Sequence, residues 1–531
     1  MRMTNKIMQN NSLYNINNNK MLQDKLSTQM STQKKITRPS DDPVIAIRAL
    51  RLRSDVSQIK QFYEKNAPDA ESWLKVTEDA LNTTTEVLKD MIEQAGKGSN
   101  KDLGVSELDI ITTQLKALKE EFYATGNVDF AGRYVFTGYR TDTTLTYTED
   151  TTQDFTITEQ LDVSAIDTIN YTNLGDLDGL TKENYDKTTP VTEDSINNAD
   201  IYRIRLSYDN LKGLADGQSI SIETVDDKNA VPVTTTPLVA AGDITIISST
   251  ATPNPYEAIQ DPANAGKAIL IPETGELLIG KDLYDGTFKG MGNDKEIRIT
   301  YEKDSWKNGD LRPQHYFACT DEDKNINYNF AKTESDPPTV PPTFNEFIPT
   351  ELAKQVMEYD VGYNQKIRIN TTADEIFTLD MDRNIDDLEN ALSELKKIAT
   401  AKENLENMMQ GMDEGETDYA NLKKTYDAAE KAYTHIRENM QKMYEGLITK
   451  VQDISDNTHV AITDSGTRSS RLSLISNRLM TQKTTFETLQ SANEDVDVTE
   501  VAVQLRTMEY SYQSALMATG KILQNSLMNY I

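Results

Sequence analysis

Cysteine and histidine are scarce in this chain of 531 residues. Cys319 is the only cysteine, and the three histidines are His315, His435 and His459. A single cysteine cannot form an intrachain disulfide, and these residues lack the spacing of any metal-binding motif. We therefore predict that the fold has no disulfide and that the chain has no metal ligands.

Motifs of catalysis are also missing. The chain contains no G-x-S-x-G elbow, no Walker loop and no G-x-G-x-x-G turn. Paired acids such as Asp226-Asp227 and Asp386-Asp387 are expected by chance in so acidic a sequence, and we interpret them as solvated surface. The Asp321–Asp323 run lacks the glycine and the later glutamate of a calcium loop. These absences predict no enzyme, with no catalytic residue and no cofactor.

Apolar residues are few and form no long run. Hydrophobic residues make up 37% of the chain and aromatic residues 7%, a balance that suits helical rods and thin β modules better than one large core. No stretch of 18 apolar residues exists, so we predict no membrane insertion. The first 20 residues lack the apolar centre of a secretory signal peptide, so any export should use another route.

Charge is distributed unevenly along the chain. The net charge is −30, yet residues 1–60 carry eleven Lys/Arg against four Asp/Glu, and residues 141–375 carry about −23. A strongly acidic body would repel the phosphates of a nucleic acid, which argues against that class of partner. We expect the basic N-terminal arm to meet an acidic partner or the acidic C-terminal part of its own kind.

The main pattern is a narrow apolar seam between Pro43 and about Ala95. Apolar and small residues recur there in steps of four and three, which predicts one long helix that packs against other helices. Asp42 is a suitable N-cap and Pro43 a suitable first residue, while Gly96 and Gly98 should end the helix.

Similar periods return near both ends of the chain. A second helix is predicted from Val105 to Thr125, a short strand or hairpin at 130–138, and C-terminal helices from about Asp382, Tyr419 and Leu472. The predicted rod core, shared by the two halves, consists of Leu52, Val56, Ile59, Tyr63, Leu74, Leu81, Leu88, Leu422, Tyr426, Ile436 and Leu447.

Between the helical ends the pattern changes to short alternating runs separated by Gly, Pro, Asn and Asp turns. The fold class is therefore α with an inserted β region: a long antiparallel helical rod from both chain ends and a β-rich outer domain, as one body or as two modules joined near 185–200. Pairing the chain ends should put this insert at the far tip of the rod. We expect five segments, namely an arm that is disordered when free (1–40), the first half of the rod (41–140), the insert (141–375), the second half of the rod (376–494) and a C-terminal helix (495–531).

Several short motifs resemble the hook-associated proteins of the bacterial flagellin family. They occur in the family's order at both ends, over roughly residues 1–140 and 380–531: Thr37–Pro43 (TRPSDDP), Arg133–Gly138 (RYVFTG), Gly466–Arg468 with Arg471-Leu472, Glu494–Asp497 (EDVD), Gln513–Leu516 and Gln524–Leu527. Filament flagellins usually carry an AADDAAG-like stretch in place of the first motif, from which Pro39 and Pro43 depart.

This resemblance implies a structural adaptor that joins the flagellar hook to the filament as a ring of subunits. Its implied partners are other copies of itself, the proximal hook-associated protein, filament flagellin and a cytosolic export chaperone. Its implied location is the extracellular flagellum, after a transient stay in the cytoplasm and export without a cleaved signal peptide. The motif at the start of the rod is Pro39, Ser40, Asp41, Asp42 and Pro43.

The resemblance also implies that both termini become paired helices on assembly. We expect the assembly interface to contain Ile7, Tyr14, Met21, Leu505, Met508, Tyr512, Leu516, Ile522, Leu523 and Leu527. Three alternatives stay open: a filament flagellin with a large outer β domain, a flagellar rod protein whose insert is an adhesin, and a cytosolic coiled-coil protein.

Overall fold

The computed structural model describes residues 5–177, 179–185, 189–196, 198–212, 220–225, 235–292, 295–328, 355–410, 412–413 and 417–525. The chain divides into two compact units, each taken by itself below. The first consists of Met1–Glu71, Tyr359–Ile367 and Ser470–Ile531, and the second of Ser72–Glu358 and Arg368–Ser469. Within the described ranges we find no helix with the length and hydropathy needed to cross a membrane.

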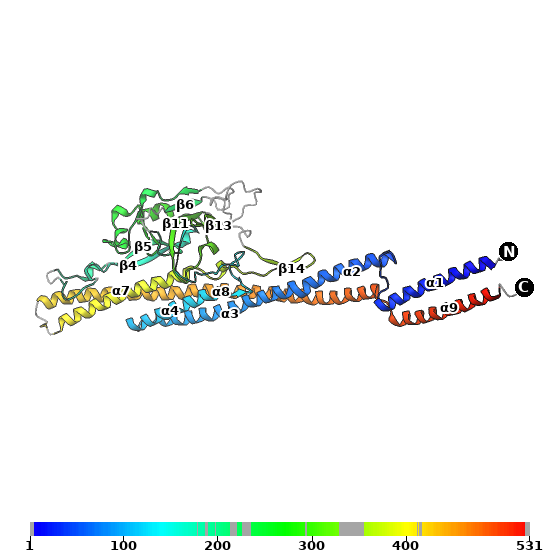
Figure 1. Ribbon diagram of the computed structural model, residues 1–531. Helices are drawn as coiled ribbons and strands as arrows, with labels where there is room; N and C mark the ends of the chain where they lie inside the picture. The colour runs from blue at the N-terminus through cyan, green and yellow to red at the C-terminus, as the bar shows by residue number, and fades with distance from the viewer. Residues whose placement is uncertain are drawn as a thin grey trace. The chain divides into compact units, whose positions relative to one another are not determined.

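The first unit is built from helices of both chain ends. It contains α1 (Asn5–Thr32), α2 (Pro43–Gln61), the C-terminal part of α8 (Thr417–Glu494) and α9 (Val498–Asn525). Helices α1 and α9 lie side by side, so that both chain termini are at the same end of this pair (Figure 1). The tip of a two-stranded hairpin, β14 (Glu358–Gly362) and β15 (Gln365–Arg368), also belongs to this unit.

The predicted helix from Pro43 is present but is not uniform. The Asp42 carboxylate accepts hydrogen bonds from the backbone N–H groups of Val44 and Ile45, which confirms it as the N-cap. After α2 the chain makes a π turn at Phe62–Asn66 before α3 (Ala67–Gly98). The π turn accommodates a change in the helical register, and it coincides with the polar Asn66, whose side chain donates to the carbonyl of Asp360.

The second unit contains four helices that the sequence largely predicted. They are α3, α4 (Val105–Thr125), α7 (Asp380–Met409) and α8. Helix α4 has the predicted bounds, and α3 runs through Gly96 and ends at Gly98. The separate helices that we predicted from Tyr419 and Leu472 are one helix, because α8 continues through Gly466 without a break.

All of the described strands lie between α4 and α7. A short hairpin, β1 (Asp129–Phe130) and β2 (Arg133–Tyr134), comes first, where a short strand or hairpin was predicted at 130–138. One sheet has the order β4-β5-β10-β9-β8 and the other β13-β12-β3-β11-β6-β7. The bounds are β3 Thr151–Leu161, β4 Ile166–Thr172, β5 Asn198–Arg205, β6 Ser221–Val225, β7 Thr235–Pro237, β8 Ile244–Ile246, β9 Ala268–Ile271, β10 Glu276–Ile279, β11 Glu296–Trp306, β12 Ala318–Asp321 and β13 Ile326–Tyr328; two short helices are α5 (Pro255–Ala258) and α6 (Lys281–Leu283).

The two sheets share one hydrophobic core. Phe155 and Ile299 of the six-stranded sheet and Ile204 and Leu277 of the five-stranded sheet belong to the same buried cluster. Each sheet also takes strands from both sides of residues 185–200. The option of two consecutive modules is therefore wrong, and the insert is a single sandwich-like body.

The insert lies along the side of α7 and α8 and not at the far tip that we predicted (Figure 1). Polar side chains of the two helices reach backbone carbonyls of the insert: Asn439 donates to Asn170 at 3.0 Å, Lys431 to Glu193 at 2.7 Å and Asn404 to Leu180 at 3.1 Å. The tip prediction failed because it used only the chain order of the elements, which does not specify such lateral contacts.

Candidate assembly surface and a polar cleft

Helices α1 and α9 bury very little apolar surface for two neighbouring helices. Among the side chains that the structure describes in this pair, Leu26 and Val501 alone are buried. Soluble proteins rarely leave contiguous large apolar groups exposed without a partner. The pair is therefore the first candidate for an interaction surface.

The predicted interface residues fall on two faces of this pair. Leu505, Met508 and Tyr512 are half-buried and continue the spacing of the buried Val501, which indicates the face of α9 toward α1. In contrast, Ile7, Tyr14, Met21 and Leu516 are exposed. The side chains of Ile522 and Leu523 and the whole of Leu527 lie outside the described residues.

A second exposed stripe on α9 was missed in the sequence. Val503, Tyr510 and Met517 follow each other at seven-residue steps and are 63%, 70% and 71% exposed. Ile7, Tyr14 and Met21 have the same spacing on α1. A seven-residue apolar repeat is the signature of helices that pack against further helices. This repeat could have identified the α9 stripe in the sequence. The sequence analysis instead followed the other apolar face of the helix, at residues 501, 505, 508 and 512.

The motif at the start of the rod is a turn followed by a helix cap. The Asp41 carboxylate accepts from the backbone N–H of Arg38 at 2.9 Å and of Thr37 at 3.2 Å, and these N–H groups lower the pKa of Asp41. Asp42 caps α2 and Pro43 occupies its first position, where no N–H is needed. Pro39 and Ser40 are exposed within the turn. The motif therefore sets where α2 begins.

Most predicted rod-core side chains are buried in their own units. The buried ones are Val56, Ile59, Leu74, Leu81, Leu88, Leu422, Ile436 and Leu447, and the half-buried ones are Leu52, Tyr63 and Tyr426. Tyr63 lies in the π turn, and the ammonium of Lys483 is 5.7 Å from the centre of its ring.

The second unit contains a polar cleft of about 750 Å³ between α4, α7 and the insert. Its walls include Lys116 and Lys119 of α4, Asp382 and Arg383 of α7, and Asp209 of the insert. Carboxylates outnumber cations along the lining. The salt bridges Lys119–Asp382 and Lys116–Glu389 (2.9 Å) cross between the two helices. Sequence reasoning did not single out this cleft, because its residues come from six separate stretches of the chain.

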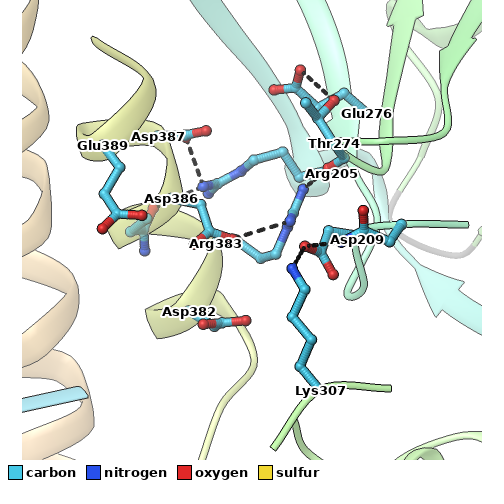
Figure 2. A network of polar contacts seen from close by, with 12 residues as sticks. Arg205, Asp209, Thr274, Glu276, Lys307, Asp382, Arg383, Asp386, Asp387 and Glu389 are labelled. Carbon is cyan, nitrogen blue, oxygen red and sulfur yellow. Dashed lines mark hydrogen bonds and ion pairs between the residues drawn. The ribbon is translucent and has the colours of Figure 1, made fainter. Parts of the chain in front are cut away.

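Beside the cleft, a buried ion-pair network joins the insert to α7 (Figure 2). Asp387 of α7 accepts from Arg203 at 2.6 Å and from Arg205 at 2.9 Å, both on β5. Arg203 also pairs with Glu276 of β10. In the opposite direction, Arg383 of α7 donates to the carbonyl of Thr274. Such crossed contacts fix the position of the sheet on the helix, because each buried charge must keep its partner.

Two carboxyl groups near the cleft have raised pKa values. Burial, together with the neighbouring Asp382, raises the pKa of Asp386 to about 6. Burial likewise raises the pKa of Asp310 to about 6. Both raised pKa values result from low solvent access and from the excess of acidic groups nearby. They are a consequence of docking a carboxylate-rich helix against an acidic insert.

Two of the scarce residues with possible chemistry, His315 and Cys319, are buried. His315 ends a short turn, and burial lowers the pKa of its imidazole to about 3 while Nε2 lies 3.2 Å from the carbonyl of Thr144. Cys319 is buried on β12, which raises the pKa of its thiol. Throughout the ranges that the structure describes, His, Cys, Asp and Glu side chains form no group of three that could hold a metal ion.

Comparison with known proteins covers the N-terminal region best. Residues 3–141 match the model of the bacterial flagellin N-terminal helical region. The resemblance to the flagellin family is confirmed for this region. The match ends beside the boundary that we predicted at residue 140 and includes α1, α2, α3 and α4.

Two curated relatives carry the same name, flagellar hook-associated protein 3. The chain is 29% identical to the protein of Salmonella typhimurium over 143 residues and to that of Escherichia coli K12 over 144 residues. In both cases the alignment covers 27% of this chain and 45% of the relative. The chain therefore matches slightly less than half the length of these relatives.

Solved structures that match this chain include a putative flagellar hook-associated protein of Vibrio parahaemolyticus and the flagellar junction protein FlgL of Legionella pneumophila. The first is 12% identical with a TM-score of 0.34, covering 86% of this chain and 100% of its own. The second is 10% identical with a TM-score of 0.26, covering 80% of this chain and 99% of its own. Both TM-scores are too low to establish a common fold by themselves.

Proposed function

We propose that this chain is a structural adaptor that joins the flagellar hook to the filament, and that its copies form a ring through α1 and α9. The observation that carries the proposal is the pair of exposed apolar stripes on these helices. The names of the two curated relatives support the flagellar location, and the flagellin-type N-terminal region supports the helical mode of assembly.

The energetics of the terminal helices favour assembly. A large apolar side chain contributes about 1.5–3 kcal/mol when it moves from water into an apolar contact. Six residues of the two stripes realise only part of this gain within the chain, since they stay largely exposed: Ile7, Tyr14, Met21, Val503, Tyr510 and Met517. Helices from neighbouring subunits would supply the missing contacts, with other copies within the ring and with hook-associated protein or flagellin above and below it.

The remaining parts of the proposal concern export and solubility. The subunit would leave the cell without a cleaved signal peptide, with a cytosolic chaperone covering its arms beforehand. Within the arms, residues 1–40 and 495–531, the segments that form α1 and α9 would stay disordered until assembly. The acidic insert would face water, where like charges keep free subunits apart.

Immunogold labelling tests the proposal directly. Antibody raised against residues 141–375 should mark a single position between hook and filament on intact flagella. Label along the whole filament would make the chain a filament flagellin. A strain that lacks the protein should have hooks without filaments and release flagellin into the medium, and normal filaments in that strain would contradict the adaptor role.

A further inference from the structure

Two breaks in the helices of the first unit lie opposite each other. One separates α1 from α2 at residues 33–42, and the other separates α8 from α9 at residues 495–497. The backbone N–H of Lys35 donates to the carbonyl of Glu494 at 2.8 Å, and that of Val496 donates to the carbonyl of Gln33 at 3.1 Å. The two breaks are thus tied together by a short antiparallel pairing of main chains.

The buried Glu494 carboxylate connects the elements around this joint, by which we mean the two paired breaks. Its side chain is 4% exposed, although glutamate is usually at the surface. Arg53 of α2 donates to both oxygens, from Nε at 2.8 Å and from Nη2 at 2.6 Å. The Lys34 ammonium lies 3.6 Å away and also contacts Asp495. A two-pronged arginine contact is both strong and directional, so the carboxylate fixes the angle of Arg53 as well as its distance.

The two helices that follow the breaks, α2 and α9, each start at a side-chain cap. Asp42 caps α2, and the Asp497 carboxylate caps α9 by accepting from the N–H groups of Thr499 at 2.8 Å and Glu500 at 3.2 Å. With both new helices capped, the joint itself decides how α1 meets α9. We define the Glu494 clasp as Lys34, Lys35, Arg53, Glu494 and Asp495.

We propose that the Glu494 clasp is closed in the free chain and sets the register in which α1 and α9 pair. Glu494 is then a positioning residue for assembly, an inference that rests on the assembly role of α1 and α9 proposed above. Starting a helix pair is costly because several residues must be fixed before the first contact forms. A closed clasp supplies that first contact. When a neighbouring subunit binds, helices α1 and α9 then form and pair starting from the clasp.

The chain supplies a matched control for this clasp. Lys60 and Glu487 form an ion pair at 3.0 Å on the same two helices, one heptad away from Arg53 and Glu494. Their side chains are 43% and 41% exposed. In the clasp Arg53 is 56% exposed, so the two pairs differ in the carboxylate, which is 4% exposed in Glu494. Exposed pairs of this kind contribute little, because water already solvates both charges. Glu487→Gln therefore removes a carboxylate from an ion pair between the same two helices, but at a position away from the two helix breaks.

The experiment measures hydrogen exchange on the full-length wild-type, Glu494→Gln, Arg53→Gln and Glu487→Gln chains. We expect the amides of Lys35 and Val496 to exchange at least about tenfold faster in the first two variants, because a hydrogen bond to a charged group is lost. Glu487→Gln should leave both rates unchanged. In cells, the first two variants should be exported at wild-type levels but be found on fewer flagella than the wild type.

Each other outcome overturns the inference. Unprotected Lys35 and Val496 amides in the wild-type chain would mean that the clasp is open when free. Unchanged exchange in Glu494→Gln, or normal incorporation into flagella despite faster exchange, would mean that Glu494 positions nothing. If the circular dichroism of Glu494→Gln shows that the variant does not fold, Arg53→Lys takes its place in the experiment. A lysine keeps the positive charge but cannot make the two-pronged contact with the carboxylate. A failed junction location would contradict the proposed function alone, since the exchange rates report on the clasp independently.

Discussion

At the scale of single residues, one glycine of α3 is needed for close packing. A Cβ on Gly98 would lie 2.5 Å from Cε1 of Tyr444, whose hydroxyl lies 2.9 Å from that of Thr112. Because Tyr444 is buried and held at its far end, its ring cannot move aside easily. Gly98→Ala should lower the free energy of unfolding by about 1–3 kcal/mol, measured by chemical denaturation.

Gly96 is the control for this substitution. It lies in the same helix, and nothing is within 4 Å of a Cβ at that position. Gly96→Ala should therefore raise the free energy of unfolding, by up to about 1 kcal/mol, because alanine favours a helix interior. Equal effects of the two substitutions would show that the helix end, and not the ring of Tyr444, determines the result.

A second prediction concerns Glu159 in the centre of the insert. It accepts from the N–H of Ser207 at 2.7 Å and from the hydroxyl of Tyr301, and its burial raises the pKa of the carboxyl from 4.5 to about 6. The folded chain therefore binds this proton more tightly than the unfolded chain does. The stability due to Glu159 is complete below about pH 4.5 and is lost as the pH rises through 6, a loss of about 2 kcal/mol.

Glu159→Gln tests this sign. The amide oxygen can accept the same two hydrogen bonds, but it carries no charge at any pH. We expect the melting temperature of the variant, relative to wild type, to be higher at pH 8 than at pH 5. The exposed Glu149→Gln should show no such dependence. A difference that shrinks as the pH rises would contradict the assigned direction.

Residue roles were predictable where they depend on near neighbours. The cap at Asp42 was identified in the sequence because its partners are two and three positions away. The contacts of Arg53, Glu494 and Gly98 could not be predicted, since their partners are hundreds of residues distant. Glu494 belongs to one of the family-like motifs, but nothing in that motif predicts that its carboxylate is buried while that of Glu487 is exposed.

At the scale of elements, the exposed stripe of α9 gives a prediction about assembly. Tyr510→Ser removes a large apolar group that is 70% exposed, so the fold and helix content should be unchanged while incorporation into flagella falls. Gln513→Ser, also at an exposed position of α9, is the control and should assemble normally. Circular dichroism and counts of labelled flagella measure the two effects. Normal assembly of Tyr510→Ser would assign the interface to other residues.

Element bounds were predictable in the helices and less so in the strands. Helix α4 has the predicted limits because a clear period ends in Gly126-Asn127. Strands β4, β12 and β13 were missed in the sequence. Strand β12 pairs with the distant β3, β4 pairs with β5, and β13 is a three-residue edge strand that pairs with β12, so their order depends on the assembled sheets. The π turn after α2 was also missed, because the seven-residue pattern continues across it.

At the scale of the whole molecule, the broad order of helices, insert and helices was predictable, but the position of the insert in the second unit was not. That position depends on arginines of β5 meeting a single aspartate of α7. In the sequence, Asp386-Asp387 was interpreted as a solvated acidic pair. The mistake came from judging charge by composition, whereas burial of an aspartate is decided by whether an arginine reaches it.

The same ion pairs predict how the second unit unfolds. Asp387→Asn removes from Arg203 and Arg205, which are 6% and 9% exposed, the α7 carboxylate that they share. Asp167, at 3.6 Å and 3.4 Å, and for Arg203 also Glu276, remain as partners within the insert. Scanning calorimetry should then show the transition of the second unit at lower temperature, with a loss of about 3 kcal/mol, and the insert should unfold before α7. Glu389→Gln is the control, since it breaks the exposed Lys116 pair on the same helix and should cost less than about 1 kcal/mol. Equal losses in the two variants would mean that the network does not hold the insert on α7, and that apolar contacts do so instead.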